Sequence, residues 1–597
     1  MPTAILTGQP VPGSSIEGDL RSLGFDVRTA ADTTEAETLL AAVPGDQRVA
    51  VVDARFVGHE HALRLGLTDP RFPLAAVPGA VTAQPGGRQA LTRAVAREHS
   101  AGGGTTLLDD LADRVVTALD ADGCAVHRPE LGSLVATVPT DPQARNEARQ
   151  AVAAVDDEAV RLKSAVKSRD GFFTTHFISP YSRYIARWCA RRGLTPNQVT
   201  TASLLTALIA AGSAATGTRA GYVVAGVLLL CSFVLDCVDG QIARYALKYS
   251  TLGAWLDATF DRAKEYAYYA GLALGAARSG DDVWALALGA MILQTCRHVV
   301  DFSFNEANHD ATANTSPTAA LSDKLDSVGW TVWLRRMIVL PIGERWAMIA
   351  VLTAATTPRI TFYVLLVGCA FAATYTTAGR VLRSLTRKAR RTDRAAQALA
   401  DLADSGPLAQ GLTRIARRVP LRAPACTALV GTAVVLLAAW FGGYGSWVPV
   451  LGAVFYVLQS PLAVARPLKG PLDWLVPPLF RAAEYCTVLI LAAKAEVNGA
   501  LPAAFGLVAA VAYHHYDTVY RIRGNAGASP AWLVRAIGGH EGRTLLVTVL
   551  AAALTASQFT VALTVLAVAV ALLVLVESIR FWVSAGAPAV HDEGEPA

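Results

Sequence analysis

Four aspartates in one apolar stretch are the residues best suited to chemistry. Asp236, Asp239, Asp257 and Asp261 lie within LDCVDGQIARYALKYSTLGAWLDATFDRAK, among apolar neighbours. Ionised carboxylates at membrane depth are costly and rare, so a set of this kind marks a functional site. If the stretch is helical, Asp236 and Asp239 share one helix face, and Asp257 and Asp261 share another.

Two such faces opposed across a helical hairpin would form a cage of carboxylate oxygens. Unneutralised carboxylates would repel one another and take up protons, so divalent cations are the natural counter-charge, and oxygen ligands favour Mg²⁺ or Mn²⁺. Gly240 lets a ligand approach the backbone, and Arg244 offers a guanidinium suited to phosphate oxygens. The alternative is a buried ion-pair network without catalysis. It is disfavoured because Arg244 is the one nearby cation expected to pair with the acids.

The composition places these residues in a membrane protein. Of 597 residues, 53% are hydrophobic and 17% charged, and the mean hydropathy is +0.36, which is too apolar for a soluble enzyme. The eight cysteines form no CxxC pair or dense framework, which excludes a disulfide-stapled fold. The net charge of +5 comes mostly from short basic clusters beside apolar segments, a pattern typical of a membrane surface. We therefore expect membrane lipids and no nucleic acid as partners.

The apolar segments predict two blocks of about six transmembrane helices each. The spans of the first block are expected near residues 200–218, 221–240, 254–278, 282–304, 346–358 and 360–382. By length, the stretch from Cys426 to Trp582 holds six more. The basic clusters RWCARRG, WLRRM and RVLRSLTRKARR flank the first block on one side, so both of its ends are expected in the cytoplasm. The location predicted is the cytoplasmic membrane, with the N-terminus and the active site facing the cytoplasm.

The N-terminal part reads as a cytosolic α/β domain. No apolar run there approaches the roughly 20 residues of a span, and β-like runs such as TAILTG alternate with helical stretches. After it, FISPYSRYIARWCARRG predicts an amphipathic helix that lies in the membrane interface or, alternatively, packs on the soluble domain. Its apolar positions are Tyr181, Tyr184, Ile185, Trp188 and Cys189. The predicted domains are residues 1–155 (α/β), 156–195 (linker and amphipathic helix), 196–395 (six helices with the acids), 396–419 (polar linker) and 420–597 (six further helices).

The spacing D-x2-D-G-x2-A-R-x8-G-x3-D-x3-D resembles the signature of the CDP-alcohol phosphotransferase family, the class I CDP-alcohol phosphatidyltransferases. The resemblance covers residues 196 to about 385 and includes the stretch TPNQVT, which leads into the first span. It implies a transferase of phospholipid or related lipid biosynthesis that moves a phospho-alcohol group from a CDP-linked lipid or polyol donor to a hydroxyl acceptor and releases CMP. It further implies that Asp236, Asp239, Asp257 and Asp261 hold two metal ions, with Asp261 also the catalytic base. The substrate contacts that it implies are Asn197, Thr200, Gly240, Ala243, Arg244, Ser250 and Gly253.

Other charged residues near the cytoplasmic span ends are less specific. Each of them could bind an acceptor phosphate or merely extend its charged group toward the interface. They are Arg262, Glu265, Arg297, His298, Asp301, Glu344, Arg345 and Arg380.

The second block resembles a degraded copy of the first. FVLDCVDGQIAR is echoed by YVLQSPLAVAR, DRAKEY by FRAAEY, HVVDFSF by HHYDTVY and IGERW by GHEGR, in the same order. The alternative is chance similarity between Ala/Val/Leu-rich helices. In the repeat register, the positions of Asp236, Asp239, Gly240 and Asp261 hold Gln459, Leu462, Ala463 and Phe480. A copy without the acids would act as a dimer-like partner within one chain, so the expected state is a monomer or a homodimer.

The N-terminal domain invites a second comparison. KSRDGFFTTHFISPYSRY resembles the junction found in family members that carry a sugar-nucleotidyltransferase domain before the membrane block. The loop in AILTGQPVPGSS has no Arg or Lys for a triphosphate, and a lone Asp53 after a strand is usually a turn residue. The expected domain is a reduced, inactive relative. Two rival functions for the whole chain are a twelve-span transporter and a catalytically silent membrane scaffold.

Overall fold

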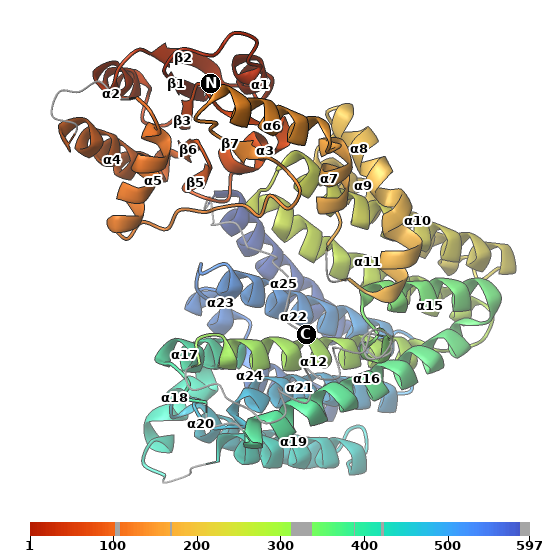
Figure 1. Cartoon of the computed structure of the whole chain (residues 1–597). Helices are drawn as coiled ribbons and strands as arrows, with labels where there is room; N and C mark the ends of the chain where they lie inside the picture. The colour runs from red at the N-terminus through yellow and green to blue at the C-terminus, as the bar shows by residue number, and fades with distance from the viewer. Residues whose placement is uncertain are drawn as a thin grey trace. The chain divides into compact units, whose positions relative to one another are not determined.

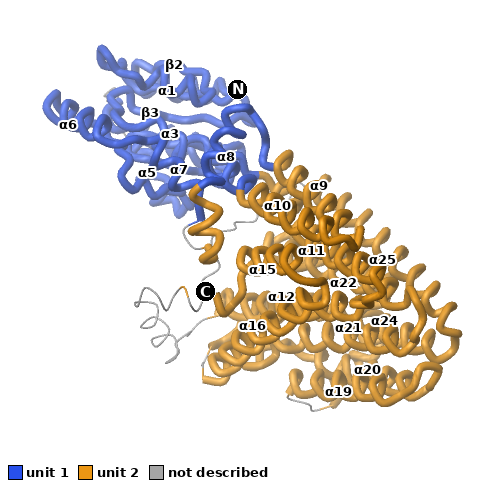
Figure 2. Tube along the Cα trace, turned by 90° about the vertical axis from the view of Figure 1, so that its right-hand side faces the viewer, with its two compact units in different colours: residues 1–168, 181–196, 238–249 blue, residues 169–180, 197–237, 250–597 orange. Residues whose placement is uncertain are grey.

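The computed structural model describes residues 1–101, 108–167, 170–311, 337–386, 389–419 and 423–584 together with Trp333 (Figure 1). It contains two compact units (Figure 2). Unit 1 comprises residues 1–168, 181–196 and 238–249, and unit 2 comprises residues 169–180, 197–237 and 250–597. Some residues of the basic clusters and the junction lie outside the described residues, namely Ser168, Arg169, Arg335, Arg336, Arg387 and Lys388.

Unit 1 is built on a mixed five-stranded sheet with the order β2-β1-β3-β6-β5. Strand β1 (Thr3–Thr7) is parallel to β2 (Asp26–Ala30) and β3 (Val49–Asp53), with Thr3 opposite Val49, whereas β6 (Ala80–Ala83) is antiparallel to β3 and to β5 (Leu74–Val77). Strands β1, β3, β5 and β6 are buried along their whole length, which explains why they read as continuous apolar runs. The predicted α/β domain is confirmed.

Within the described part of this domain, seven α-helices and a small second sheet accompany the five-stranded sheet. Strands β4 (Val57–Gly58) and β7 (Ala136–Thr137) pair antiparallel. The helices are α1 (Ile16–Ser22), α2 (Thr33–Ala42), α3 (Glu60–Leu67), α4 (Arg88–Ala101), α5 (Leu111–Ala121), α6 (Pro142–Ala153) and α7 (Asp157–Ser164).

The predicted amphipathic helix is α8 (Ser179–Arg191), which follows a π-helical turn at Thr174–Ile178. Its large apolar side chains face outward: Tyr181 is 71% exposed and Trp188 52%. The guanidinium of Arg192 lies 4.4 Å from the Trp188 ring. An exposed apolar and aromatic face bordered by arginines is the composition of a helix at a membrane interface. Cys189 was predicted on this face but is only 5% exposed, so it lies on the buried side of the helix.

The described residues form two successive sets of six long helices, which lie in unit 2 except for Pro196 and residues 238–246, the last turns of the second helix, which belong to unit 1 (Figure 1). The first set is α9 (Pro196–Ala215), α10 (Arg219–Ala246), α11 (Thr251–Arg278), α12 (Trp284–Asn308), α15 (Ile342–Ala355) and α16 (Pro358–Thr386). After the short helices α17 (Asp393–Leu402) and α18 (Pro407–Ala416), the second set is α19 (Pro424–Phe441), α20 (Val448–Val464), α21 (Val476–Lys494), α22 (Ala500–Arg523), α24 (Gly539–Ala553) and α25 (Ala556–Ser584). The short helix α23 (Ala531–Ala536) precedes α24.

Six helical segments among the described residues are long and apolar enough to cross a membrane. They are α9, α10, α16, α19, the stretch Asp473–Lys494 that includes α21, and α25. Of the other long helices, α15, α20 and α24 have 14, 17 and 15 residues, below the roughly 17 to 25 that a span needs or at its lower limit. The chain is therefore a multi-pass α-helical membrane protein with an N-terminal α/β domain, as predicted.

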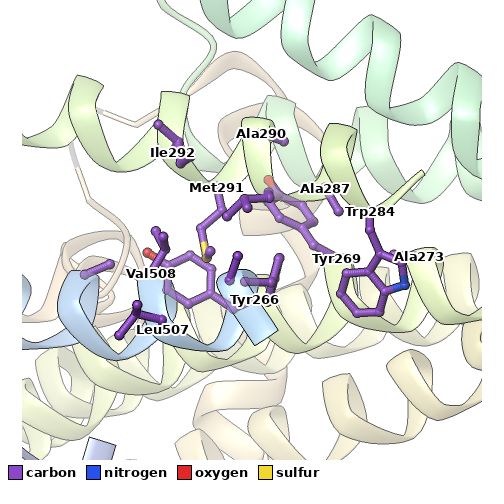
Figure 3. Close-up of a cluster of buried hydrophobic side chains, with 14 of the residues drawn as sticks. Tyr266, Tyr269, Ala273, Trp284, Ala287, Ala290, Met291, Ile292, Leu507 and Val508 are labelled. Atoms are coloured by element: carbon purple, nitrogen blue, oxygen red, sulfur yellow. The ribbon is translucent and has the colours of Figure 1, made fainter. Parts of the chain in front are cut away.

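The two blocks share one hydrophobic core. Figure 3 shows Tyr266 of α11, Met291 of α12 and Leu507 and Val508 of α22 in a single cluster. Helix α12 packs on both α21 and α22, and α11 packs on α22. The second block therefore supports the two helices that follow the α10–α11 connection.

Candidate active site

A helical hairpin positions the acids. Helix α10 ends at Ala246, Leu247 adopts a φ of 51°, and α11 begins at Thr251, where the Ser250 hydroxyl accepts a hydrogen bond of 3.0 Å from the Gly253 amide. This cap satisfies one of the free amides at the start of α11. Asp236 on α10 and Asp261 on α11 are equally far from the connection along the chain. Each lies about one helical turn farther from it than the other acid of its helix, Asp239 on α10 and Asp257 on α11.

Three of the four predicted metal ligands come together at this hairpin. Asp236, Asp257 and Asp261 are half-buried, and each offers a carboxylate oxygen within 4.8 Å of those of the other two. Asp239 is 4% exposed and follows Asp236 by one turn of α10, in the part of that helix that belongs to unit 1. The acidic cluster of unit 2 thus contains Asp236, Asp257 and Asp261.

A lysine that the sequence analysis overlooked lies against this cluster. Lys264 is fully buried, and its ammonium pairs with Asp236, lies 2.9 Å from Asp261 Oδ1 and donates to Ser203 Oγ at 3.2 Å. The expectation that Arg244 is the one nearby cation was therefore wrong. The signal was present in the sequence, because Lys264 follows Asp261 by three residues and so shares its helix face.

Three of the predicted substrate residues meet where α9 begins beside the first turn of α11. A Cβ atom at Gly253 would lie 2.7 Å from Asn197 Oδ1 and 2.8 Å from Ser250 Oγ, which only glycine avoids without movement of its neighbours. Thr200 is buried one turn further along α9. The amide of Asn197 and the hydroxyl of Ser250 can donate and accept hydrogen bonds, as recognition of a polar nucleotide requires.

The remaining predicted substrate residues lie on the last turns of α10, in unit 1. The Nη1 atom of Arg244 approaches to 3.4 Å from the place of a Cβ atom at Gly240, so the absence of a side chain there leaves room for the guanidinium. Arg244 Nε donates to the carbonyl of Ala165 at 2.6 Å, just after α7. Ala243 is half-buried, and its carbonyl accepts from the Lys248 amide at 3.0 Å as α10 ends.

The less specific charged residues mostly pair with one another. Glu265 binds Arg262 at 2.8 Å and Arg345 at 3.2 Å, and it accepts from the Tyr269 hydroxyl at 2.7 Å. Asp301 pairs with Arg380. These contacts favour a structural role for the five charged residues.

Three more of these candidates have different surroundings. His298 Nε2 lies 2.8 Å from Gln294 Nε2, and Glu344 accepts from the Phe173 amide at 3.2 Å. Arg297 is 6% exposed, and its Nε and Nη1 atoms have no hydrogen-bond partner among the described residues. Arg297 therefore keeps donors that an acceptor phosphate could use.

The corresponding region of the second block contains no acidic cluster among the described residues. Phe480 is fully buried and stacks on the His540 ring, with 4.1 Å between the ring centroids. Ala463 is also buried, and Leu462 and Gln459 are half-buried on α20. An aromatic ring packed on imidazole leaves no carboxylate for a hard cation.

Asp53 of the N-terminal domain behaves as a turn residue. Its carboxylate accepts from the Arg55 amide at 2.8 Å and from Arg55 Nη2 at 2.8 Å. The hydrogen bond between its guanidinium and Asp53 raises the pKa of Arg55 above its usual value. The carboxylate is thus occupied by a neighbouring guanidinium.

Comparison with known families identifies the block that carries the acids. Residues 193–372 match the family described as CDP-alcohol phosphatidyltransferase. This segment is a CDP-alcohol phosphatidyltransferase domain. The resemblance inferred from the aspartate spacing is therefore confirmed. Residues 393–597, which hold the second block, match a family of unknown function, DUF5941.

Several curated relatives are similar to parts of the chain. Over 118 residues it is 33% identical to the bifunctional IPC transferase and DIPP synthase of Aquifex aeolicus, covering 19% of this chain and 26% of that protein. Over 113 residues it is 31% identical to the archaetidylinositol phosphate synthase of Pyrococcus horikoshii, covering 19% and 58%. Over 131 residues it is 34% identical to the phosphatidylinositol phosphate synthase of Streptomyces avermitilis, covering 21% and 51%. The chain thus spans between 26% and 58% of the length of these relatives.

Proposed function

We propose that this chain is a membrane-embedded transferase that moves a phospho-alcohol group from a CDP-linked donor to a hydroxyl acceptor and releases CMP. One observation carries the proposal: Asp236, Asp257 and Asp261 converge within 4.8 Å inside the CDP-alcohol phosphatidyltransferase domain. A transporter would need its charged residues near the membrane midplane at the interface of two repeats. Among the described residues, the acids cluster in the first block, within about three turns of the α10–α11 connection.

The acids have the chemistry to hold Mg²⁺ or Mn²⁺. Hard divalent cations prefer carboxylate oxygens, and opposite ligands of one Mg²⁺ ion are about 4.2 Å apart because each Mg–O bond is 2.0–2.1 Å. Oxygens within 4.8 Å of one another need to move only slightly to share an ion. Asp236, Asp239, Asp257 and Asp261 are the proposed ligands of two ions. When bound, these ions neutralise the diphosphate and the leaving CMP.

The protein groups then bind the donor and move one proton. Asn197, Thr200, Ser250 and Gly253 are the proposed contacts of the CDP moiety. Gly240, Ala243 and Arg244 are the proposed contacts of its phosphates, with the Arg244 guanidinium as the charged donor. Asp261 is the proposed base. It takes the proton of the acceptor hydroxyl as that oxygen forms a bond to the alcohol-bearing phosphorus and the bond from this phosphorus to CMP breaks.

Inositol phosphate is the first acceptor to test, because two of the relatives are named synthases of archaetidylinositol phosphate and phosphatidylinositol phosphate. A CDP-linked lipid such as CDP-diacylglycerol is the first donor. Purified full-length chain, donor and Mg²⁺ should release CMP only when an acceptor is added. Release that continues in excess chelator, or in the Asp257→Asn variant, would contradict the proposal.

The orientation that we propose follows from the basic clusters. The arginines of α8 lie at the start of the first block, and positive residues favour the cytoplasmic side. The N-terminal domain and the active site are accordingly placed at the cytoplasmic face of the cell membrane. Labelling of an introduced cysteine in the α10–α11 connection from one side of sealed vesicles would test this orientation.

The second block is proposed to be a degenerate copy of the first. In the first block, Glu265 on α11 binds Arg262 of the same helix and Arg345 of α15. In the second, Glu484 on α21 binds Arg481 at 3.1 Å and Arg543 of α24 at 2.5 Å. The same triad thus joins the third and fifth long helices of each block.

A second pair of contacts repeats as well. Glu344 of α15 accepts from the Phe173 amide, in the segment that leads into α8 before the first block. Glu541 of α24 accepts from the amides of Gly406 and Ala409, at the start of α18 before the second block. In both blocks, a glutamate of the fifth helix therefore holds the segment that precedes the first.

The packing between the blocks has the form of a two-fold pair. If α11 corresponds to α21 and α12 to α22, the contacts of α12 with α21 and of α11 with α22 are equivalent, and α12 meets its own counterpart α22. Such reciprocal contacts characterise an isologous interface. We therefore expect the full chain to be monomeric, with the second block in the place of a partner subunit. Light scattering in detergent would measure this state, and a stable homodimer joined through α11 and α12 would contradict it.

The N-terminal domain is proposed to be a reduced nucleotidyltransferase relative without activity of its own. The stretch of residues 8–15 between β1 and α1, GQPVPGSS, offers no lysine or arginine, and Asp53 is bound to Arg55. Calorimetry with CTP and Mg²⁺ on the full chain should measure the same CTP affinity for the wild type and for the Asp53→Asn variant, which serves as the control. A loss of CTP binding in the variant would reassign the domain.

A further inference from the structure

Lys264 is an uncommon residue to find in a metal-binding cluster. Its ammonium contacts Asp236 and Asp261, the two acids of the cluster that lie farther from the α10–α11 connection. Lys264 lies on the next turn of α11 beyond Asp261, so along this helix it is farther from the connection than that acid. Asp257, the third acid of the cluster, lies about one turn closer to the connection on α11.

The ammonium is fixed in this place. Lys264 is fully buried, its ammonium also donates to the Ser203 hydroxyl, and it lies 5.5 Å from the ring centroid of Trp346. Leaving the carboxylates would strand a buried charge without a counter-ion, which is strongly unfavourable. A divalent ion bound by these carboxylates would therefore lie close to the fixed ammonium of Lys264, which repels it.

Comparison of the two blocks separates this lysine from the structural residues around it. Between DRAKEY and FRAAEY, Arg262, Glu265 and Tyr266 keep their types as Arg481, Glu484 and Tyr485. Asp261 and Lys264 are both replaced by uncharged residues, Phe480 and Ala483. The lysine is absent where the acids are absent, which groups it with the active site rather than with the helix-packing triad.

A charge count gives the consequence. The four aspartates contribute four negative charges, and two divalent ions would balance them completely. With Lys264 included, two ions leave the set with a net charge of +1, whereas one ion leaves it at −1. Without the donor, a second ion would only exchange a net charge of −1 for one of +1 and so would bring no further neutralisation. The diphosphate of a CDP-linked donor brings two further negative charges, and the second ion then lowers the net charge from −3 to −1.

We infer that Lys264 makes binding of the second divalent ion depend on the donor, so that the site holds one ion alone and two with the nucleotide. This inference rests on the proposed function. Lys264 acts as a positioning residue, because it touches the carboxylates and not the reacting atoms. The order of binding would prevent the site from filling with metal before the donor arrives.

The test counts bound Mn²⁺ on the full-length chain in detergent micelles by equilibrium dialysis, with and without CDP, which carries the diphosphate but no alcohol to transfer. The wild-type chain should bind one Mn²⁺ alone and two with CDP. Lys264→Gln should bind two without CDP, with at least a tenfold gain in affinity for the second ion, because removing a unit charge about 4 Å away exceeds that factor at an effective dielectric constant near 20.

Two controls keep the outcome interpretable. Lys264→Arg keeps the charge and should retain one ion without CDP. Lys494→Gln makes the same charge change in the second block, where the lysine donates to the Gly442 carbonyl at 2.8 Å, and should behave as the wild type. If Lys264→Gln does not fold, the wild-type count still decides: two tight ions without CDP overturn the inference.

The result is distinct from that of the proposed function. Two ions in the absence of CDP together with acceptor-dependent CMP release would overturn the role of Lys264 and leave the transferase in place. No CDP-dependent ion and no CMP release with any donor would overturn both.

Discussion

The sharpest structural prediction concerns the matched glutamates Glu265 and Glu484. Replacing either by alanine removes the acid that two buried arginines share. Arg262 and Arg345 lose their contacts of 2.8 and 3.2 Å with Glu265, and both arginines are less than 9% exposed. Breaking a buried pair by removing one partner costs about 3–5 kcal/mol, since the remaining charge is left uncompensated.

The structure predicts a smaller loss of stability for Glu484→Ala than for Glu265→Ala. After Glu484→Ala, Arg481 and Arg543 still pair with Asp404 at 3.3 and 2.8 Å. The loss of stability should therefore be near 3 kcal/mol for Glu484→Ala and nearer 5 kcal/mol for Glu265→Ala. Unfolding by SDS in mixed micelles, followed by tryptophan fluorescence, measures both values on the full chain.

An exposed ion pair supplies the control. Glu17 pairs with Arg21 on the surface of α1, and Glu17→Ala should change stability by less than about 1 kcal/mol. If Glu265→Ala or Glu484→Ala changes the unfolding free energy by as little as this control, the triads do not stabilise the helix packing within each block. The matched triads would then no longer support a repeat.

Three further predictions address the site and its surroundings. Asp257→Asn should abolish metal-dependent CMP release and weaken Mn²⁺ binding at least tenfold, since an anionic ligand is lost, and undiminished binding would remove Asp257 from the site. Asp261→Asn should bind CDP but turn over at least a hundredfold more slowly, as measured by calorimetry and CMP release, because the base acts only on the acceptor hydroxyl; an unchanged rate would reassign the base. Asp404→Asn should lower stability near pH 7 by about 3 kcal/mol. Burial alone would raise the pKa of Asp404, but Arg543, His514 and Arg481 hold it well below its usual range, so the stability difference should be constant above pH 5 and shrink as the pH falls below about 4; a difference that grows in acid would contradict this assignment.

The sequence predicts the hairpin and its acids because both depend on local spacing. Intervals of three and four residues place the aspartates on helix faces, and two long apolar runs joined by a few residues must lie side by side. The metal-ligand set in unit 2 and the place of Ser250 and Gly253 follow from this local geometry. The mixed sheet of unit 1 is harder to predict from the sequence, because the antiparallel pairing of β6 with β3 depends on long-range contacts.

The ion pairs between helices could not be predicted in the same way. Asp404 lies in the loop between α17 and α18, yet it contacts Arg481, His514 and Arg543 from three other helices. The partner of Lys264 on α10 is likewise 28 residues away in sequence. Such contacts depend on the rotation of each helix within the bundle, which hydrophobic periodicity defines only approximately for helices that are apolar all round.

The most direct test of the central claim is mass spectrometry of lipids from cells that express the full chain, the Asp257→Asn variant or neither. A transferase of this class predicts a phosphodiester-linked lipid, with inositol phosphate as the first head group to examine, that accumulates with the wild-type chain and stays at background with the variant. Identical lipid profiles in all three, with the protein folded in the membrane and CDP-linked donor present, would contradict the account.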